Sequence, residues 1–531
     1  MSELDHLTQQ LKAGHISRRE FVGRAIALGV SAATATGLLP AEALAQTPKR
    51  GGSVKFGLAQ GATTDSADPA TFNHAGTLVP LWGTLANSLT EVDAKGNITP
   101  DLAESFESTN KASSWVFKLR RGVTFHNGKD LTADDVVASF RHHMGPNTKS
   151  GAKSLLSGVQ DVKADGKSTV IFTLDTGNAD FPYLASDYHL PIMPANADGT
   201  ADWQSNVRTG PFSFVSWQPG VRSKFKRNPN YFEPGKPYFD EVEFIVITDP
   251  AARMAALTTG EVDWIARAEL KTVSLLKRHP QINVIDVAGY LHHMYVMDTT
   301  VAPFNNPDVR NAFKLAINRE EIAQKVFLGH GQLANDNPIA PAVKFGVDPK
   351  PRHSYDPQKA KALLKKAGMD NVKVDLYASD RSFVGAVDAS VLFQQSAKAA
   401  GIDINVIRES GEAWGTNVWN KKPFYTDYWA GRPTVDWMLS TVYAKSSPWN
   451  LTRWTHARFN DLLAQARAET DEKTRAGMYA ELQQIIHDDG GAIVFFFSNY
   501  VEAASKKLAH GVLANNLESD GAKMAKRWWF A

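Results

Sequence analysis

The sequence predicts a mixed α/β protein with several lobes. Predicted strands and helices alternate along its 531 residues without a fixed period, which argues against a repeat architecture. Hydrophobic residues make up 43% of the chain and charged residues 21%, a composition typical of globular proteins. At roughly 100–200 residues per domain, this length accommodates two or three domains.

The first 45 residues predict an export signal. A basic zone with Arg18-Arg19 precedes a mild apolar run over residues 25–39, and Ala43-Leu44-Ala45 follows. The paired arginines are typical of the twin-arginine route. The run is shorter than the roughly 20 apolar residues of a membrane helix, so we expect cleavage after Ala45 and a soluble periplasmic protein. An ordinary N-terminal helix is the alternative interpretation.

Several strands and one helix are predicted in the first half of the chain. Thr132 is expected to cap a helix whose first turn holds Asp134 and Asp135 at the positive end of its dipole. Short alternating or apolar stretches bounded by turn residues predict strands. They cover residues 54–58, 115–119, 212–215, 221–225 and 239–247.

Three Asp-Pro or Asn-Pro pairs mark helix starts in the second half, since Asp or Asn caps a helix and proline fits its first position. They lie at residues 249–250, 306–307 and 356–357. The order strand 372–376, helix 386–400 and strand 402–406 predicts a right-handed parallel unit. After residue 459 the chain reads as helical until a buried strand at 492–497.

Composition and motifs point away from catalysis and nucleic acid. The chain has 58 basic against 56 acidic residues and no evident basic patch, so we expect no nucleic-acid partner. It contains no cysteine, which excludes disulfides, thiolate metal sites and cysteine nucleophiles. No zinc-protease, phosphate-loop or nucleophile-elbow motif occurs. We therefore expect no enzyme activity, no cofactor and no metal site, and we interpret the pairs His142-His143 and His292-His293 as hydrogen-bonded or surface residues.

Residues 115–140, WVFKLRRGVTFHNGKDLTADDVVASF, resemble the signature of family 5 extracellular solute-binding proteins, the dipeptide- and oligopeptide-binding type of ABC importers. Other stretches agree in the same order along the chain: TGPF at 209–212, RNPNYF at 227–232, PDVRNAF at 307–313 and DPQKAKALL at 356–364.

The resemblance implies two lobes joined by a hinge, with an extra subdomain inserted in lobe one. Lobe one is expected over residues 48–88, 205–287 and 495–531, the inserted subdomain over 89–204, and lobe two over 288–494. The implied partners are a small-molecule or peptide ligand, which the closing lobes capture, and an inner-membrane ABC permease that receives it. We expect a monomer.

The resemblance also implies which segments line the cleft. They are a loop near the N-terminus, a strand at the start of lobe two, and three loops of lobe two. The predicted ligand-binding residues are Asp65, Ser66, His293, Met294, Tyr295, Arg381, Trp414, Trp429, Arg432, Asp436 and Trp437. The tryptophans suit a cleft because each supplies flat apolar area and one N–H donor.

One segment departs from the peptide-binding pattern. Peptide binders commonly show Gly-Trp-x-x-Asp there, and the aspartate pairs with the ligand's ammonium group. Here Arg432 stands near that place, although Asp436 follows closely and a shifted alignment restores an acid. Arginine instead suits a carboxylate or phosphate, which favours a ligand that presents an acid group to Arg432 or Arg381. Either arginine alternatively pairs with a carboxylate such as Asp380, Asp427 or Asp436.

The ligand classes considered are a peptide, a modified amino acid and an opine-like sugar–amino-acid conjugate. Two further readings remain: the same fold binding a metal chelate or haem, and an exported enzyme. Ligand absorbance and turnover by the purified protein would distinguish them.

Overall fold

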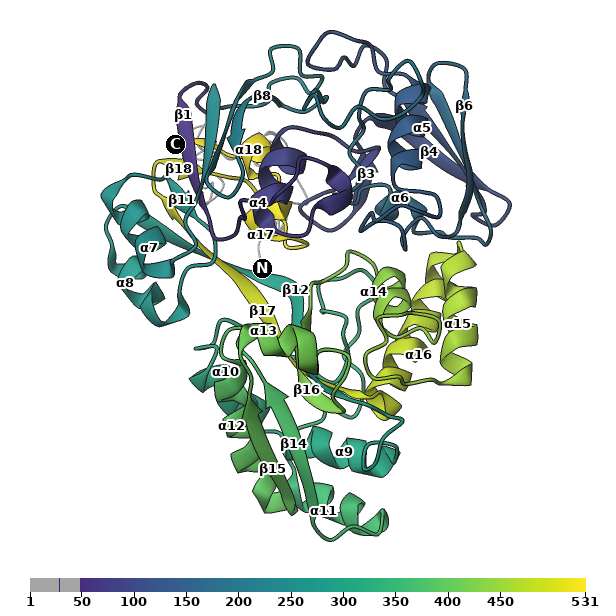
Figure 1. The fold of residues 1–531 in the computed structure, drawn as a ribbon, viewed down its shortest axis with the longest axis vertical. Coiled ribbons are helices and arrows are strands. Elements are labelled where there is room, and N and C mark those ends of the chain that lie inside the picture. The colour runs from purple at the N-terminus through teal and green to yellow at the C-terminus, as the bar shows by residue number, and fades with distance from the viewer. Residues whose placement is uncertain (1–27, 29–47) are drawn as a thin grey trace.

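The computed structural model describes residues 48–531 and Leu28, so the predicted export signal, apart from Leu28, lies outside the described residues. Figure 1 shows two lobes stacked along the long axis of the molecule, which confirms the predicted mixed α/β, two-lobed fold. The upper lobe holds the first part of the described chain and its C-terminal end, and the lower lobe holds the segment from α9 (Pro307–Ala316) to α16 (Glu472–Asp489). Within the described residues, no helix has the length and apolar character needed to cross a bilayer.

The upper lobe is built on a mixed sheet that begins at the predicted N-terminal strand. β1 pairs in parallel with β10 and β11, and β8 and β9 form the predicted antiparallel hairpin beside β10. Phe56 of β1 lies opposite Phe244 of β10, and both rings are buried with Trp264 in the core of this lobe. The bounds are β1 Ser53–Leu58, β8 Phe212–Gln218, β9 Arg222–Arg227, β10 Glu241–Val246 and β11 Trp264–Ile265.

The predicted Asp-Pro and Asn-Pro helix starts are confirmed by cap geometry. The Asp249 side chain accepts from the Ala252 N–H at 2.7 Å, and this helix ends at Gly260, whose φ of 79° is left-handed. Asn306 and Asp356 cap their helices in the same way. These helices are α7 Pro250–Thr259, α9 Pro307–Ala316 and α11 Pro357–Lys366, and α8 Val273–Arg278 follows α7.

A separate four-stranded antiparallel sheet stands at one side of the upper lobe (Figure 1). Its order is β4-β5-β7-β6, and α5 packs on it through Phe140, whose ring centroid lies 4.7 Å from that of Phe172. Thr132 and Asp135 form a capping box at the start of α5, as the sequence indicated. We call this unit the small-sheet subdomain; its elements are β4 Ala103–Thr109, β5 Ser114–Leu119, α5 Ala133–His142, β6 Val159–Asp165, β7 Thr169–Leu174 and α6 Phe181–Leu184.

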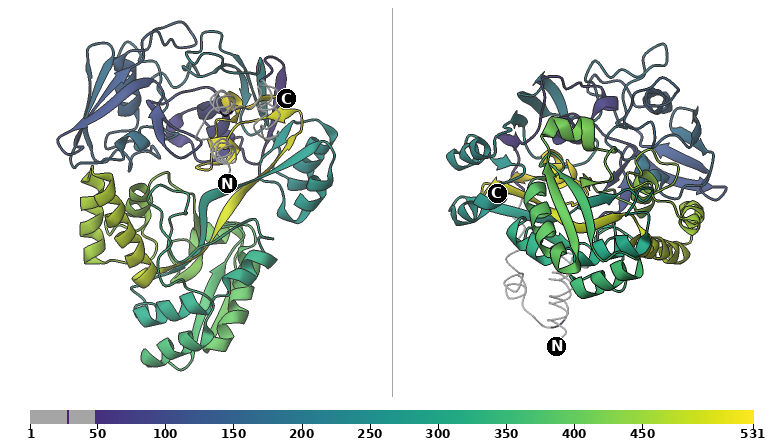
Figure 2. Two further views of the ribbon diagram at one scale, coloured as in Figure 1. Left: turned by 180° about the vertical axis from the view of Figure 1, so that it is seen from behind. Right: turned by 60° about the horizontal axis from the view of Figure 1, so that its bottom comes forward.

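Two long strands connect the lobes. β12 (Ile282–Met297) and β17 (Ala492–Ser505) pair antiparallel along most of their length, and Figure 2 shows them from behind running together from one lobe to the other. Their register shifts between Ala288 and His292 and again between His293 and Met294. The strand predicted at 492–497 is thus longer than expected, because pairing with β12 extends it through a polar stretch without strand periodicity.

The lower lobe surrounds the other end of these strands. β14 (Val372–Ala378) and β15 (Ile402–Arg408) pair in parallel across α12 (Ala386–Ala397), as predicted, and β16 (Phe424–Trp429) joins β14 to β12. The strand order from lobe to lobe is β15-β14-β16-β12-β17-β11-β1-β10-β9-β8. The remaining elements used below are α10 Arg319–Lys325, β13 Gly331–Leu333, α13 Gly411–Ala413, α14 Val435–Val442, α15 Ala457–Ala468 and α16 Glu472–Asp489.

Alternation along β12 divides the lower lobe into two cores. Met294 and Val296 face what we call the α14–α16 core, whereas Tyr295 and Met297 face the α9–α12 core on the opposite side of the sheet. The same alternation holds on β16, where Tyr425 faces the α14–α16 core and Phe424 the α9–α12 core. Each side chain of these strands is therefore assigned to one face by its position.

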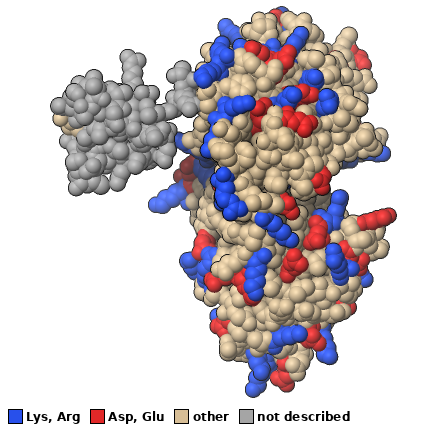
Figure 3. Space-filling view, turned by 90° about the vertical axis from the view of Figure 1, so that its left-hand side faces the viewer, with Lys and Arg blue, Asp and Glu red and all other residues tan. Residues whose placement is uncertain are grey.

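The chain ends in the upper lobe. The segment with α17 (Glu518–Gly521) and α18 (Met524–Arg527) buries Met524 and Trp528 in the core around Phe56. On the face drawn in Figure 3, basic and acidic side chains are interspersed over both lobes, which agrees with the near-balanced charge of the sequence.

Candidate ligand-binding cleft

Asp65 and Ser66 shape the loop that follows β1. Asp65 accepts from the Ala62 N–H at 2.9 Å through Oδ2, and its Oδ1 lies 3.0 Å from Nε2 of His74. The Ser66 hydroxyl accepts from the Asp68 N–H at 3.1 Å. Both side chains have partners within their own loop, and their contact with a ligand stays a prediction.

The three predicted residues of β12 point to opposite faces of the sheet. Met294 is buried in the α14–α16 core, and Tyr295 is buried in the α9–α12 core. His293 lies on the Tyr295 side, with Nε2 2.5 Å from the Ser498 hydroxyl and its ring 4.2 Å from that of Phe383. Burial lowers the pKa of His293 to about 3, so the ring is neutral. The structure therefore does not gather these three side chains on one surface.

Arg432 follows β16 and is half-buried. Its Nη1 donates to the backbone carbonyls of Ala430 at 2.8 Å and Gly431 at 3.2 Å, and its guanidinium carbon lies 5.9 Å from the ring centroid of Trp437. Among the described residues it forms no ion pair with a carboxylate, so neither Asp380, Asp427 nor Asp436 neutralises it. The Nε and Nη2 groups of Arg432 donate no hydrogen bond within the described residues, so they are free to bind an acid group of a ligand.

Asp436 has a different partner. Both of its carboxylate oxygens accept from Nε of Arg467 on α15, at 3.2 and 3.3 Å, and the carboxylate is buried. Burial raises the pKa of Asp436, and the Arg467 charge opposes that rise. Its predicted contact with a ligand ammonium group is not tested by this arrangement.

The three predicted tryptophans lie on three segments near the junction of the lobes. Trp414 and Trp429 pack with the α14–α16 core, and the Trp429 ring lies 5.5 Å from that of Trp449. Trp437, although part of α14, packs into the core of the small-sheet subdomain. The indole Nε1 of all three is buried without a hydrogen-bond partner among the described residues.

Arg381 stands apart from this group. It is exposed and lies just after β14. Its side chain is close to Gly411, since a Cβ placed on that glycine would lie 3.6 Å from the Cβ of Arg381. Gly411 begins α13, the short helix before Trp414. Arg381 forms no ion pair with a carboxylate in the described part of the chain, and its role stays a prediction.

The lobes touch through a buried ion pair. Asp180 of the small-sheet subdomain lies 2.7 Å from Nη2 of Arg475 on α16, and their side chains are only 7% and 9% exposed. Beside it, the Ala179 N–H donates to the Arg467 carbonyl at 2.9 Å. These contacts border a cavity of about 290 Å³ that also contacts Phe345. The structure therefore shows the lobes in contact, and a buried ion pair and a backbone hydrogen bond form part of their interface.

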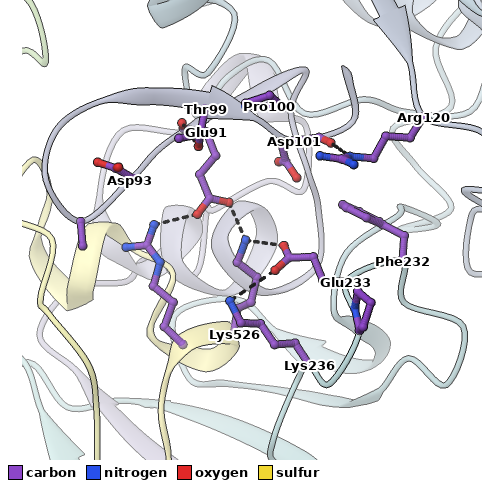
Figure 4. Close-up of a pocket in the computed structure, with 13 residues that line it drawn as sticks. Glu91, Asp93, Thr99, Pro100, Asp101, Arg120, Phe232, Glu233, Lys236 and Lys526 are labelled. Atoms are coloured by element: carbon purple, nitrogen blue, oxygen red, sulfur yellow. Dashed lines mark hydrogen bonds and ion pairs between the residues drawn. The ribbon is translucent and has the colours of Figure 1, made fainter. Parts of the chain in front are cut away.

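A second cavity, of about 420 Å³, lies within the upper lobe (Figure 4). Glu91 lies between Lys526, at 2.6 Å, and Arg527, at 2.7 Å, and Lys526 also reaches Glu233 at 2.8 Å. Burial raises the pKa of Glu91, but the two cations outweigh it and the net shift is downward. The central charges are matched within the protein, so this cluster joins the C-terminal segment to the rest of the lobe.

Sequence reasoning missed two buried polar groups near the cleft. Within residues 48–531, neither ring nitrogen of the buried His292 has a hydrogen-bond partner, which corrects the expectation that both histidines of its pair are hydrogen-bonded or at the surface. Asp427 of β16 is buried, accepts from the Trp419 indole at 3.2 Å and has no cationic partner among the described residues. Burial raises its pKa to about 7. The alternation of side chains along β12 and β16 places both residues on the Met294 face of the sheet. The sequence could have indicated this only if the pairing of the two strands had been known.

The fold is that of a two-lobed protein whose lobes are joined by a pair of long strands. The chain belongs to the bacterial extracellular solute-binding proteins of family 5, because the model described as "Bacterial extracellular solute-binding proteins, family 5 Middle" matches residues 97–450. It is accordingly a solute-binding component of an ABC importer and not an enzyme.

Similar proteins agree with this assignment. The glutathione-binding protein GsiB of Pectobacterium atrosepticum is 27% identical over 475 residues, covering 85% of this chain and 90% of GsiB. Among solved structures, HbpA2 from Haemophilus parasuis has a TM-score of 0.77 at 25% identity, covering 88% of this chain and 98% of HbpA2. The periplasmic binding protein DppA from Helicobacter pylori, in complex with the peptide STSA, has a TM-score of 0.75 at 26% identity, covering 91% of this chain and 99% of DppA.

Proposed function

We propose that this protein captures a small carboxylated peptide-like solute, with glutathione as the first candidate, between its two lobes in the periplasm. Arg432 binds a carboxylate of the solute and the tryptophans around it cover the apolar parts. The observation that carries the proposal is the half-buried Arg432 guanidinium without an acidic partner among the described residues. A cation in this position costs free energy unless an anion matches it.

The donor set around Arg432 supports an acceptor-rich ligand. Three buried indole N–H groups, from Trp414, Trp429 and Trp437, lack partners in the described chain, and indoles donate but do not accept. Glutathione offers two carboxylates and two amide carbonyls as acceptors, and one ammonium group. The relatives named for glutathione binding make it the natural first probe.

Isothermal titration calorimetry with glutathione tests this proposal. A hydrogen bond to a charged group is worth about 1.5–3 kcal/mol, so Arg432→Gln should weaken binding by about 10- to 100-fold. Arg432→Lys should recover part of the loss, because it keeps the charge without the two-pronged geometry. Arg121→Gln, at an exposed turn of the small-sheet subdomain, is the matched control and should bind like the wild type.

Two blocked probes identify the carboxylate that Arg432 binds. One is glutathione esterified at the glycine carboxylate, and the other is esterified at the glutamyl carboxylate. The ester at the group bound by Arg432 should bind weakly to the wild type and be insensitive to Arg432→Gln. Equal binding of glutathione by wild type and Arg432→Gln would contradict the proposal.

Native mass spectrometry of the mature protein, purified gently from its periplasm, tests ligand and location together. A released carboxylated peptide supports the proposal, and a sugar–amino-acid conjugate moves it to opine-like solutes. N-terminal sequencing of the same sample should show cleavage after Ala45. Loss of export when Arg18-Arg19 is replaced by Lys-Lys is the expected sign of the twin-arginine route.

A further inference from the structure

His292 is a fully buried polar side chain that forms no hydrogen bond with any other side chain or backbone group of the described residues. Its side chain is 0% exposed, and neither Nδ1 nor Nε2 has a partner within the described residues. A buried polar group left in this way ordinarily destabilises a fold. A leucine or methionine would fill the same space without that loss, so the imidazole calls for an explanation.

The other histidines from residue 48 onwards do not share this feature. His143 hydrogen-bonds Ser150 at 2.7 Å, His293 bonds Ser498 at 2.5 Å, and His487 contacts Asp488 at 2.7 Å. Each of these has at least one ring nitrogen satisfied by the protein. His292 is the one histidine in the described chain for which neither nitrogen is.

The position of His292 on β12 places its ring on the face of the sheet that carries Met294. It lies opposite Trp429 of β16 and opposite Phe497 of β17, whose ring centroid is 6.0 Å away. It shares its face with Met294 rather than with His293. It also stands at the register shift of β12, where the strand passes from one lobe to the other. The ring therefore lies where β12 passes between the lobes, opposite Trp429, whose indole N–H has no partner among the described residues.

Arg432 determines the charge state of this ring together with burial. Burial is the larger cause and the nearby Arg432 cation the smaller, and together they lower the pKa of His292 to about 3. The ring is therefore neutral near pH 7, with one N–H donor and one acceptor nitrogen. A neutral imidazole can donate one hydrogen bond without adding a second positive charge beside Arg432. It therefore suits a hydrogen-bond acceptor of the ligand, such as a carbonyl oxygen.

We propose that His292 contacts the ligand, donating a hydrogen bond to a second polar group, a carbonyl or carboxylate oxygen, of the solute whose first carboxylate Arg432 binds. This inference rests on the proposed function and adds the residue that selects for the second group. His292 and Arg432 then bind two different acceptor groups of the solute, and the indole of Trp429, the β16 partner of His292, supplies a third donor. A solute with a single acid group and no second acceptor would satisfy only one of the two.

The test uses glutathione as the probe and the variant His292→Leu of the full mature chain. Loss of one neutral hydrogen bond should weaken binding by about tenfold. The thermal midpoint of the ligand-free variant should be equal to or above that of the wild type, because an unsatisfied buried polar group has been removed. His292→Asn, which keeps a donor but shortens it, should fall between the two.

Tyr443→Phe is the matched control. Its hydroxyl is also buried in the α14–α16 core without a partner in the described chain, but it lies at the end of α14 beside residues of the lower lobe. Removing that oxygen should leave glutathione affinity unchanged. A direct readout is the imidazole ¹⁵N spectrum, assigned by comparison with His292→Leu, in which the ring signals of residue 292 should shift when glutathione is added.

The outcomes separate the two proposals. If His292→Leu binds glutathione like the wild type while Arg432→Gln does not, the His292 proposal is overturned and the proposed function stands. If His292→Leu loses affinity while Arg432→Gln does not, the anchoring role of Arg432 is overturned and the His292 contact stands. If the wild type does not bind glutathione at millimolar concentration, both are overturned.

Discussion

The buried pair Asp180–Arg475 should control closure of the lobes without contacting the ligand. Its partners belong to different lobes and lie 2.7 Å apart, so the pair exists only while the lobes touch. Asp180→Asn is the sharpest perturbation, since the side chain is nearly isosteric and the Asp180 carboxylate makes no helix-capping bond to α6. The substitution leaves the Arg475 charge buried against a neutral amide.

The expected magnitude follows from burial. Two unit charges about 4 Å apart attract by about 4 kcal/mol at an effective dielectric constant of 20. Breaking a buried pair by removing one partner costs about 3–5 kcal/mol. The asparagine still accepts a hydrogen bond from Arg475, and water rehydrates both groups when the lobes separate. We therefore expect Asp180→Asn to destabilise the closed form relative to the open form by about 1.5–3 kcal/mol, less than the full cost of breaking a buried pair. That is about 10- to 100-fold in ligand affinity when the open form dominates without ligand.

Two measurements check this prediction. Calorimetry with glutathione should show the weaker binding, and small-angle scattering should show a larger radius of gyration at the same ligand concentration. Lys344→Gln is the matched control: it removes an exposed pair with Glu472, at 2.5 Å, in the same cavity but within one lobe. It should change neither quantity. Unaltered affinity and scattering in Asp180→Asn would refute the reasoning.

Three further substitutions are predicted. Gly431→Ala would place a Cβ 1.9 Å from the Cβ of Tyr290, and thermal denaturation should show a free energy of unfolding lower by about 2–4 kcal/mol. Gly415→Ala is the control and should leave the free energy of unfolding unchanged, because a Cβ there meets no described atom within 4 Å. Asp135→Ala removes a buried acceptor of the Ala195 and Thr132 N–H groups, at 2.7 and 2.8 Å, and should lower unfolding stability by about 2–4 kcal/mol without changing ligand affinity. Burial raises the pKa of Asp427 from an ordinary 3.8 to about 7. Between these two pH values the folded protein keeps the proton and the unfolded chain has lost it, so the free energy of unfolding of the wild type falls as the pH rises from 3.8 to about 7. Asp427→Asn should therefore be more stable than the wild type in urea at pH 8.5, by on the order of 2–4 kcal/mol, and the advantage should shrink at pH 5; an equal advantage at both would contradict it.

Local sequence signals predicted much of the fold because they act within one turn or one strand. The Asp249-Pro250 pair determines a helix start through a cap only three residues long, and the structure shows that cap. The β14–α12–β15 unit was likewise predictable from strand, helix and strand in succession. The length of β17 was not, because residues 499–505 are held by pairing with β12 and β11, both more than 200 residues earlier in the chain.

The site was less predictable because distant residues decide which of its polar groups have a partner and which do not. The partner of Asp436 is Arg467, on a helix whose packing no local pattern reveals. His292 and His293 are adjacent in sequence, yet one has a serine partner from β17 and the other has none in the described chain. The face of the sheet that each of them occupies depends on the register of β12 against β16, which is fixed only when the sheet assembles.

The paired strands β12 and β17 also determine how much entropy closure requires. Two lobes joined by loose linkers would search many relative orientations before meeting, and a ligand would have to offset that loss. A hydrogen-bonded ribbon keeps the lobes at a high effective concentration and confines their motion to bending and twisting near the register shifts at residues 288–294. Most of the free energy of ligand contact then remains available as affinity, which suits a protein that must collect dilute solutes.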